Sequence, residues 1–302
     1  MITPRPNITV NADVTNPGQF FACCGLLELA HRLWPGAEGW FDGASSRFAI
    51  SSNDSSATLQ HLFCKMRDCD LTGLSKQERD ELEAFKKESR DLKKHREALP
   101  PDKEQRGKEL GTQARKGAIQ IGAPFNLSLD WWQTGDDHIA TPKTWAGRQE
   151  IQKVARACQD ALSGIGEPKN MFDHGCVLRM PHEYCKRKPE ESKSVEPFYF
   201  DARRFAHALD TGFSLDAQDA ETEAHPAVEL LCLIGLQRFR PVATADKWAF
   251  EYSLWSTPLP VSVASAVVCG AVSRGRRYRF SLLFRDDQKR YKAFDFATPI
   301  GD

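Results

Sequence analysis

The sequence predicts an α+β fold, and three observations support this prediction. Two strongly apolar segments begin with the helix-starting pairs Asn16-Pro17 and His225-Pro226. Roughly the last sixty residues contain short segments of alternating apolar residues, a pattern typical of an antiparallel sheet. Residues 75–117 form a charged tract with few apolar side chains, which predicts a helical protrusion. We therefore expect an N-terminal αβ region (1–74), a charged helical insertion (75–117) and a C-terminal α+β region (118–302).

The N-terminal region is expected to hold one helix that is buried on most faces. Residues 7–14 alternate and predict a short strand, after which Asn16 is placed to cap a helix. The helix over residues 20–34 is apolar on nearly every side and ends at Pro35-Gly36. Two further short strands are expected on either side of a turn at Asp42-Gly43.

The charged insertion is predicted to be a helical hairpin or a protruding helix with a thin packing seam. Leu82, Phe85 and Leu92 lie on or near one helical stripe, and Pro100-Pro101 breaks the run. Two interpretations stay open for its charged surface. It contacts nucleic acid or a partner, or it is a solvated face along which opposite charges pair.

The C-terminal region is predicted to contain two helices followed by a sheet. A strand is expected at residues 125–132, a helix at 143–165, and a strand running into a helix at 198–209. A second apolar helix follows His225-Pro226 and ends before Pro241. The strands of the sheet are expected at residues 248–255, 261–269, 278–284 and 291–296.

The two apolar helices share a pattern. Gly25 lies in a run that ends at Pro35, and Gly235 lies in a similar run that ends at Pro241. A glycine lets a helix lie close against a sheet or a second helix. Duplication and coincidence explain this similarity about equally well.

Composition limits the function classes. The 41 Lys and Arg balance the 41 Asp and Glu, which argues against binding nucleic acid by bulk charge alone but leaves local contact open. The 41% apolar content, with 18 Phe and 7 Trp, excludes a mainly disordered chain. No apolar run is long enough for a bilayer and no secretory signal is visible, so we expect a cytoplasmic protein whose nine cysteines are reduced.

Catalytic and metal-binding motifs are weak. The chain has no phosphate loop, no nucleophile elbow and no His-Glu-x-x-His. Asp136-Asp137-His138 is capable of binding a metal, but a solvated turn explains it better. The best zinc candidate joins His174, Cys176, His182 and Cys185. Its spacing differs from that of a standard finger, so incidental thiols are favoured and we predict neither a cofactor nor catalytic residues.

Three basic clusters are the predicted nucleic-acid contacts. Cations on one surface bind phosphates, and neighbouring aromatic residues such as Tyr278 and Phe280 add base stacking. The alternative is that charged edge strands merely resist aggregation. The candidates are Lys93, Lys94 and Arg96 on the charged helix, Lys186, Arg187 and Lys188 in a long loop, and Arg274, Arg276, Arg277 and Arg279 near a hairpin tip, with Lys289, Arg290 and Lys292 on the next strand.

Two segments resemble a known family. TNPGQFFACCGLLELA at residues 15–30, continued by RLWPGAEGWF at 32–41, is similar to the opening of a small non-catalytic subunit family of type I-G (formerly I-U) CRISPR systems. ELLCLIGLQRFRP at residues 229–241 fits the same resemblance. Both segments predict buried helices, so the resemblance transfers no binding residue to this chain.

The resemblance implies a subunit of an RNA-guided surveillance (Cascade) complex, with a role like that of a reduced large subunit. Its implied partners are the other effector subunits, guide RNA, target DNA and the helicase-nuclease. In such complexes the guide reads sequence, whereas protein reads shape, backbone and the short flanking motif. The rival hypotheses are a metal-dependent nuclease and a protein-only adaptor of the same defence system.

Overall fold

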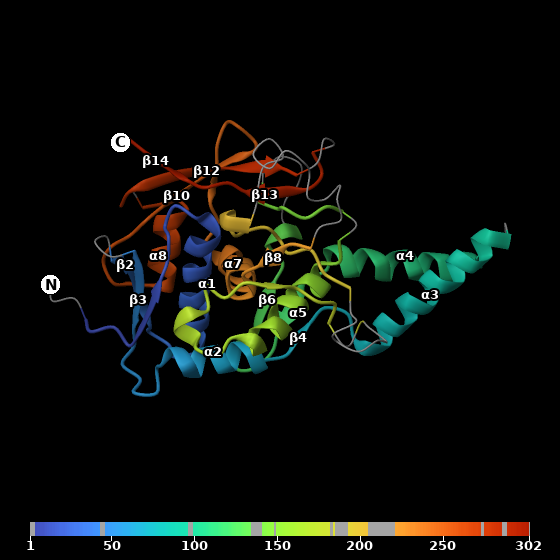
Figure 1. Cartoon of the computed structure of the whole chain (residues 1–302), viewed down its shortest axis with the longest axis horizontal. Helices are drawn as coiled ribbons and strands as arrows, with labels where there is room; N and C mark the ends of the chain where they lie inside the picture. The colour runs from blue at the N-terminus through green and yellow to red at the C-terminus, as the bar shows by residue number, and fades with distance from the viewer. Residues whose placement is uncertain are drawn as a thin grey trace.

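The computed structural model confirms the mixed α+β fold (Figure 1). It describes residues 4–42, 46–95, 99–133, 141–147, 149–181, 184, 193–204, 221–272, 275–285 and 289–301. The α-helices are α1 (Pro17–Leu33), α2 (Leu59–Asp68), α3 (Lys76–His95), α4 (Pro101–Lys116), α5 (Ile151–Ala161), α7 (Pro226–Arg238) and α8 (Val261–Val268). Short 3-10 helices are η1 (Trp131–Gln133), η2 (Leu162–Gly164), η3 (Pro168–Asn170) and η6 (Ala202–Arg204).

The strands form small antiparallel sheets. Those of the N-terminal half are β1 (Ile8–Asn11), β2 (Glu38–Asp42), β3 (Arg47–Ser51), β4 (Leu71–Thr72), β5 (Ile119–Ile121) and β6 (Leu127–Leu129). The remainder are β7 (Cys176–Val177), β8 (Glu223–Ala224), β9 (Val242–Ala243), β10 (Ala249–Ser253), β11 (Leu259–Pro260), β12 (Arg277–Phe284), β13 (Lys292–Phe294) and β14 (Thr298–Ile300).

The two apolar helices, α1 and α7, cross at their glycines in the centre of the molecule (Figure 1). A methyl group added at Gly25 would overlap the carbonyl oxygen of Leu231, and one added at Gly235 would overlap that of Phe21. The expected close approach is therefore an approach of these two helices to each other. The predicted cap is also present, since Asn16 Oδ1 accepts hydrogen bonds from the Gly18 and Gln19 N–H groups at 3.1 and 3.4 Å.

Two antiparallel sheets lie beside this helix pair, and the first combines strands from both ends of the chain. In the sheet ordered β1-β3-β2-β11, the expected hairpin of β2 and β3 places Phe41 opposite Phe48, and β11 adds a strand from the C-terminal region. In the second sheet, β12 lies between β10 and the strands β13 and β14. Residues from both terminal regions form one continuous hydrophobic core.

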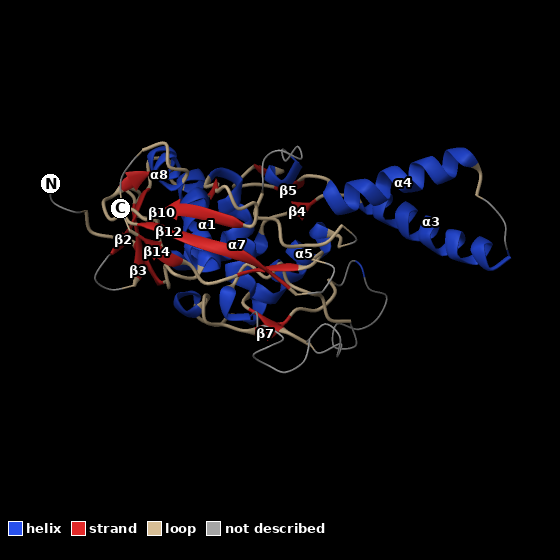
Figure 2. Cartoon of the chain, turned by 90° about the horizontal axis from the view of Figure 1, so that it is seen from above, coloured by secondary structure: helices blue, strands red, loops and turns tan. Residues whose placement is uncertain are grey.

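The charged insertion is a helical hairpin, as predicted. Helices α3 and α4, here called the arm, project together from one end of the molecule (Figure 2). They form a separate small apolar cluster of Leu74, Leu82, Leu110 and Ala114, with Phe85 packed against it. The seam is as thin as the few apolar residues of this tract indicate.

One predicted strand is wrong, because residues 261–268 form α8. Valine is enriched in strands, and the valines of this segment favoured that assignment. The buried residues Val261, Ala264, Val267 and Val268 nevertheless follow a helical spacing.

Three other predicted elements are shorter than expected. The helix of residues 143–165 begins only at Ile151, and the strand of residues 125–132 narrows to β6 followed by η1. Lys143 and Trp132 consequently lie on connecting chain. At 198–209 the structure has irregular chain and η6, and 205–209 lie outside the described residues.

The described cysteines are free thiols, as expected. Across the described residues, no helix combines the length and the apolarity needed to cross a membrane.

Candidate nucleic-acid interface

The predicted cluster on the charged helix lies at the far end of the arm. Lys93 and Lys94 are in the last turn of α3, and Arg96 lies outside the described residues. A helix of twenty residues is about 30 Å long. The arm therefore carries these lysines well away from the rest of the molecule (Figure 2).

Charge is unevenly distributed along the arm. In α3, residues 76–84 contain two cations and four carboxylates, whereas residues 87–95 contain four Lys or Arg and two carboxylates. Lys94 is 73% exposed and lies 3.6 Å from Asp91, which is a loose ion pair. Along α3 the base is therefore acidic and the tip basic, whereas α4 carries Asp102 and Glu104 in its first turn at the tip and Arg115 and Lys116 in its last turn at the base.

Many of the other arm charges pair with one another. The ion pairs join Arg106 to Glu81 at 3.2 Å, Lys103 to Glu88 at 2.6 Å and Lys108 to Glu104 at 2.7 Å. This pairing supports the solvated-face interpretation for the middle of the arm. Among the described residues of the tip, 87–95 and 101–107, the six Lys and Arg exceed the four Asp and Glu.

The arginines of the C-terminal sheet are not equivalent. Arg277 and Arg279 both bind Glu251 on the neighbouring strand β10, with Arg277 Nη2 at 2.5 Å from Oε2 and Arg279 Nε at 2.9 Å from Oε1. Burial would raise the pKa of Glu251, but hydrogen bonds from Arg279 and Arg277 outweigh it and lower that pKa. One carboxylate thus offsets part of the charge of two half-exposed arginines.

Arg276 differs from this pair because its guanidinium lies over the Tyr278 ring, 5.7 Å from the centroid. The expected base stacking on Tyr278 and Phe280 is wrong. These rings are only 4% and 1% exposed, because alternate residues of β12 face the core. Arg274 and the loop cluster Lys186, Arg187 and Lys188 lie outside the described residues.

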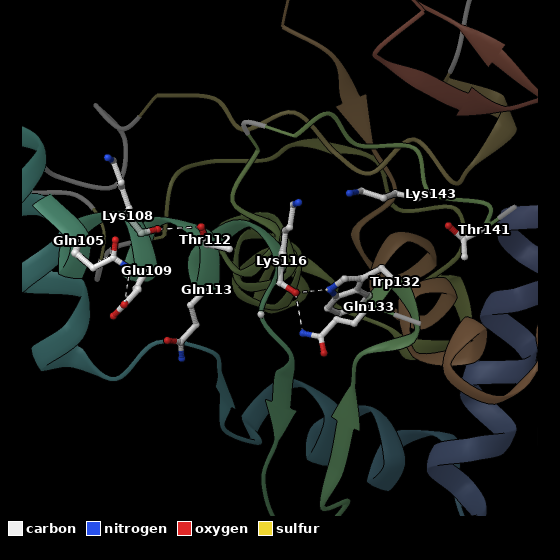
Figure 3. Close-up of a pocket in the computed structure, with 11 residues that line it drawn as sticks. Gln105, Lys108, Glu109, Thr112, Gln113, Lys116, Trp132, Gln133, Thr141 and Lys143 are labelled. Carbon is white, nitrogen blue, oxygen red and sulfur yellow. Dashed lines mark hydrogen bonds between the residues drawn. The ribbon is translucent and has the colours of Figure 1, made fainter. Parts of the chain in front are cut away.

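A further basic site is formed by three lysines from separate parts of the chain. Lys116 ends α4, Lys143 lies on the chain before α5, and Lys292 begins β13. We call these three residues the lysine cluster. Lys116 and Lys143 line a groove of about 800 Å³ between α4 and the chain around η1 (Figure 3). The Lys143 side chain extends toward Lys116, and both ammonium groups lie above Trp132 and Gln133 in the view of Figure 3.

Hydrogen bonds to backbone carbonyl groups hold the segments that carry these lysines together. The Lys116 carbonyl accepts from Trp132 Nε1 at 3.1 Å and from Gln133 Nε2 at 2.8 Å. The Lys292 N–H donates to the Thr144 carbonyl at 3.0 Å, which ties β13 to the residue after Lys143. The three positive charges are therefore placed near one another by the fold.

The electrostatics of Lys143 reflect this arrangement. Burial lowers the pKa of its ammonium group, and the charges of Lys116 and Lys292 lower it further. Its Nζ lies 5.2 Å from the Trp145 ring centroid. Within the described ranges, neither Lys116 nor Lys143 has a carboxylate partner.

More lysines continue from Lys292 over a partly buried aromatic pair. Lys292 and Lys247 lie over the Trp248 ring at 5.2 and 4.6 Å, and Lys289 lies 5.4 Å from the Phe284 ring. The rings of Trp248 and Phe284 meet edge to face. Because lysines lie over these rings, the region offers positive charge rather than open stacking faces.

Sequence reasoning named Lys289 and Lys292 but missed Lys116, Lys143 and Lys247. Lys143 stands alone in sequence, 27 positions after Lys116, and only the tertiary structure brings the two together. The available signal was a lysine flanked by Pro142 and Trp145 within an expected helix start.

A buried polar network lies at the start of α7, away from solvent. Asp201 Oδ2 lies 2.7 Å from His225 Nδ1, and Asn16 Nδ2 donates to Asp201 Oδ1 at 2.7 Å. Burial would raise the pKa of Asp201, but hydrogen bonds from His225 and Arg203 hold it well below its usual range. Asp201 and His225 are at most 1% exposed, so this pair ties α1 and α7 together and is closed to a substrate.

The metal candidates fall largely outside the described residues. His182, Cys185 and the 136–138 triplet are all in undescribed segments. In the part of the chain that the structure describes, no three His, Cys, Asp or Glu residues are grouped to hold a metal ion.

Comparisons with family models, curated proteins and solved structures found no match for this chain.

Proposed function

We propose that this chain is a non-catalytic subunit of a type I-G CRISPR surveillance complex and contacts guide RNA and target DNA. The resemblance of residues 15–41 and 229–241 to the small-subunit family supports the choice of complex. The observation that carries the nucleic-acid role is the basic tip of the arm. The proposal includes a role in reading the flanking motif and in recruiting the helicase-nuclease.

The arm suits such a role for physical reasons. A neutral chain has no bulk attraction for nucleic acid, so its contacts depend on where the cations are placed. The arm holds Lys93 and Lys94 about 30 Å from its base and beyond the acidic first half of α3, which would repel a phosphate backbone. A subunit held in place by protein neighbours can reach a nucleic acid in this way.

The test uses the assembled complex. The other effector subunits and guide RNA are co-expressed with or without this chain, and assembly, target-DNA affinity and target cleavage are measured. We expect the complex without the chain to lose target binding and cleavage. Equal assembly, binding and cleavage without it would contradict the proposal.

A variant of the arm tests whether its basic tip contacts nucleic acid. In Lys87→Gln/Lys93→Gln/Lys94→Gln, target affinity should fall and its salt dependence should become shallower, since each phosphate contact releases counterions. The matched control is Lys169→Gln, which removes an exposed lysine that pairs with Glu167 elsewhere in the chain. Equal affinity of the arm variant and the control would remove the arm from the interface.

A protein-only adaptor is the second candidate, and the ion pairs along the middle of the arm favour it. An adaptor would bind the helicase-nuclease through this charged surface and would show no salt-dependent binding to nucleic acid. Binding of the purified chain to labelled RNA and DNA over a salt series separates the two candidates.

A further inference from the structure

We propose that the lysine cluster, Lys116, Lys143 and Lys292, binds phosphate groups of single-stranded nucleic acid. This inference rests on the proposed function, which supplies nucleic acid as the source of phosphate. It adds a second contact at the base of the arm, separate from the arm tip and from the arginines of β12.

The first argument is the geometry of the groove. Its walls come from the last three turns of α4 on one side, and from Trp132, Gln133, Thr141 and Lys143 on the other. Lys116 and Lys143 stand on opposite walls, and the Lys143 side chain extends toward Lys116 (Figure 3). A phosphate between them would accept hydrogen bonds from both sides.

The second argument is the electrostatic imbalance. Bringing like charges together while partly removing one from water costs free energy in the empty site. Among the described lining residues, Lys108 pairs with Glu104, and the one carboxylate, that of Glu109, lies about 10 Å along α4 from Lys116, so it offsets this cost only in part. The hydrogen bonds of Trp132, Gln133 and Thr144 keep the cluster from opening. An anion removes the cost.

The third argument concerns the form of the nucleic acid. A groove of about 800 Å³ has the size of a small-molecule pocket, so it admits a phosphate and its sugar but not the full width of a duplex. Lining residues from Gln105 to Lys116 extend along about 16 Å of α4, which gives an extended strand room to follow the helix. Trp145 and Trp248 lie under lysines, and Trp132, which lines the groove, is only 8% exposed, so contact is with the backbone and independent of base sequence.

The test measures binding of fluorescently labelled oligothymidine and oligouridine to the full chain by anisotropy, over a salt series. We expect Lys116→Gln/Lys143→Gln to bind about tenfold more weakly, with the slope of log affinity against log salt reduced by about 1.4, because a single strand contributes about 0.7 for each phosphate contact. Lys169→Gln should match the wild type, and Lys116→Arg/Lys143→Arg should retain most of the affinity. Thermal melting of each variant checks that the fold is intact.

Two further binding measurements identify the source of the phosphate. A DNA duplex of equal length should lose less than twofold affinity in the double Gln variant, and inorganic pyrophosphate should compete only weakly with the oligonucleotide. Unchanged single-strand affinity and salt slope in the double variant would overturn the inference. So would an equal loss for the duplex, or pyrophosphate binding tighter than the strand. Loss of affinity in the arm variant alone would overturn this site while leaving the proposed function in place.

Discussion

The crossing of α1 and α7 and the arm both hold two helices together, but they do so by opposite means. At the crossing, two glycines bring backbones into contact, and the surrounding side chains are almost all buried. In the arm, one small apolar cluster at the base is supplemented by exposed ion pairs. Burial stabilises by roughly 25 cal/mol per Å² of apolar area, whereas an exposed ion pair contributes about 0–1 kcal/mol.

This difference means that the residues that stabilise the fold are not the residues that are exposed for contact with a partner. The helix crossing leaves no freedom for substitution and presents no surface, so its residues hold the fold. Substitutions in the arm should reduce stability only slightly, and the arm presents a charged surface on nearly every side. The residues on which the proposed function bases its choice of complex therefore lie in the helix crossing and its surroundings, and the residues available for binding lie in the arm.

The largest effect should come from a single methyl group at the crossing. Gly25→Ala places Cβ against the Leu231 carbonyl, which is backbone and cannot rotate away. We expect the free energy of unfolding to fall by about 3 kcal/mol, as for a strongly overpacked site. Chemical denaturation of the purified variant measures this change.

A glycine in the arm provides the matched control. A Cβ at Gly111 would approach only the flexible Arg115 side chain, at 3.5 Å. Gly111→Ala should leave stability unchanged or raise it by up to about 1 kcal/mol, because alanine favours the helix. Similar losses for both variants would show that the crossing is not the tighter contact.

The next effect concerns pH, because two buried glutamates of the helix pair have opposite environments. Burial and the nearby charge of Asp201 raise the pKa of Glu229 from 4.5 to about 8. The folded state then keeps a proton that the unfolded chain releases, so stability is greatest below pH 4.5 for this group and falls as pH rises toward 8. We expect the free energy of unfolding to fall over this pH range, measured by denaturation at several pH values.

Glu28 serves as the control for this dependence. Burial would raise its pKa, but hydrogen bonds from Arg238 and Arg32 outweigh burial and lower it. The stability it contributes is present above its unfolded pKa and is lost as pH falls. Glu229→Gln should therefore flatten the decline between pH 5 and about 8, whereas Glu28→Gln should keep it. An unchanged decline in Glu229→Gln would assign the effect to another group.

A moderate, local effect is expected at the arm seam. Phe85 packs against the cluster of Leu82, Leu110 and Ala114 and lies over Gly107. Phe85→Ala should destabilise the arm by about 1–2 kcal/mol, less than at a fully buried phenylalanine, because its side chain is only partly buried. Hydrogen exchange should accelerate in α3 and α4 while α1 and α7 keep their protection. Faster exchange in α7 would show that the arm and the core unfold together.

Sequence reasoning predicted the rigid part well, because local signals and burial agree there. The Asn16 cap, the limits set by Pro35 and Pro241, and the close approach at Gly25 are all present. It failed at α8, where the strand preference of valine conflicted with a helical spacing of buried residues.

The candidate site was harder to predict, because it depends on tertiary proximity. Clustered cations such as Lys93 and Lys94 are visible in sequence, but nothing in the sequence shows that Arg277 and Arg279 share Glu251. The approach of Lys143 to Lys116 requires the fold of α4 and η1. Charge runs thus predicted exposed basic surface, and the lysine cluster emerged only from the assembled structure.

The smallest effect should come from an ion pair on the arm, although its geometry is good. Both Arg106 nitrogens, Nε and Nη2, lie 3.2 Å from Glu81 oxygens, yet both side chains are more than 40% exposed. Water and salt screen such a pair, so Glu81→Gln should cost less than about 0.5 kcal/mol in the free energy of unfolding. A loss above about 1 kcal/mol, or one that persists in high salt, would mean that the arm depends on its charges for stability, and the contrast with the helix crossing would then fail.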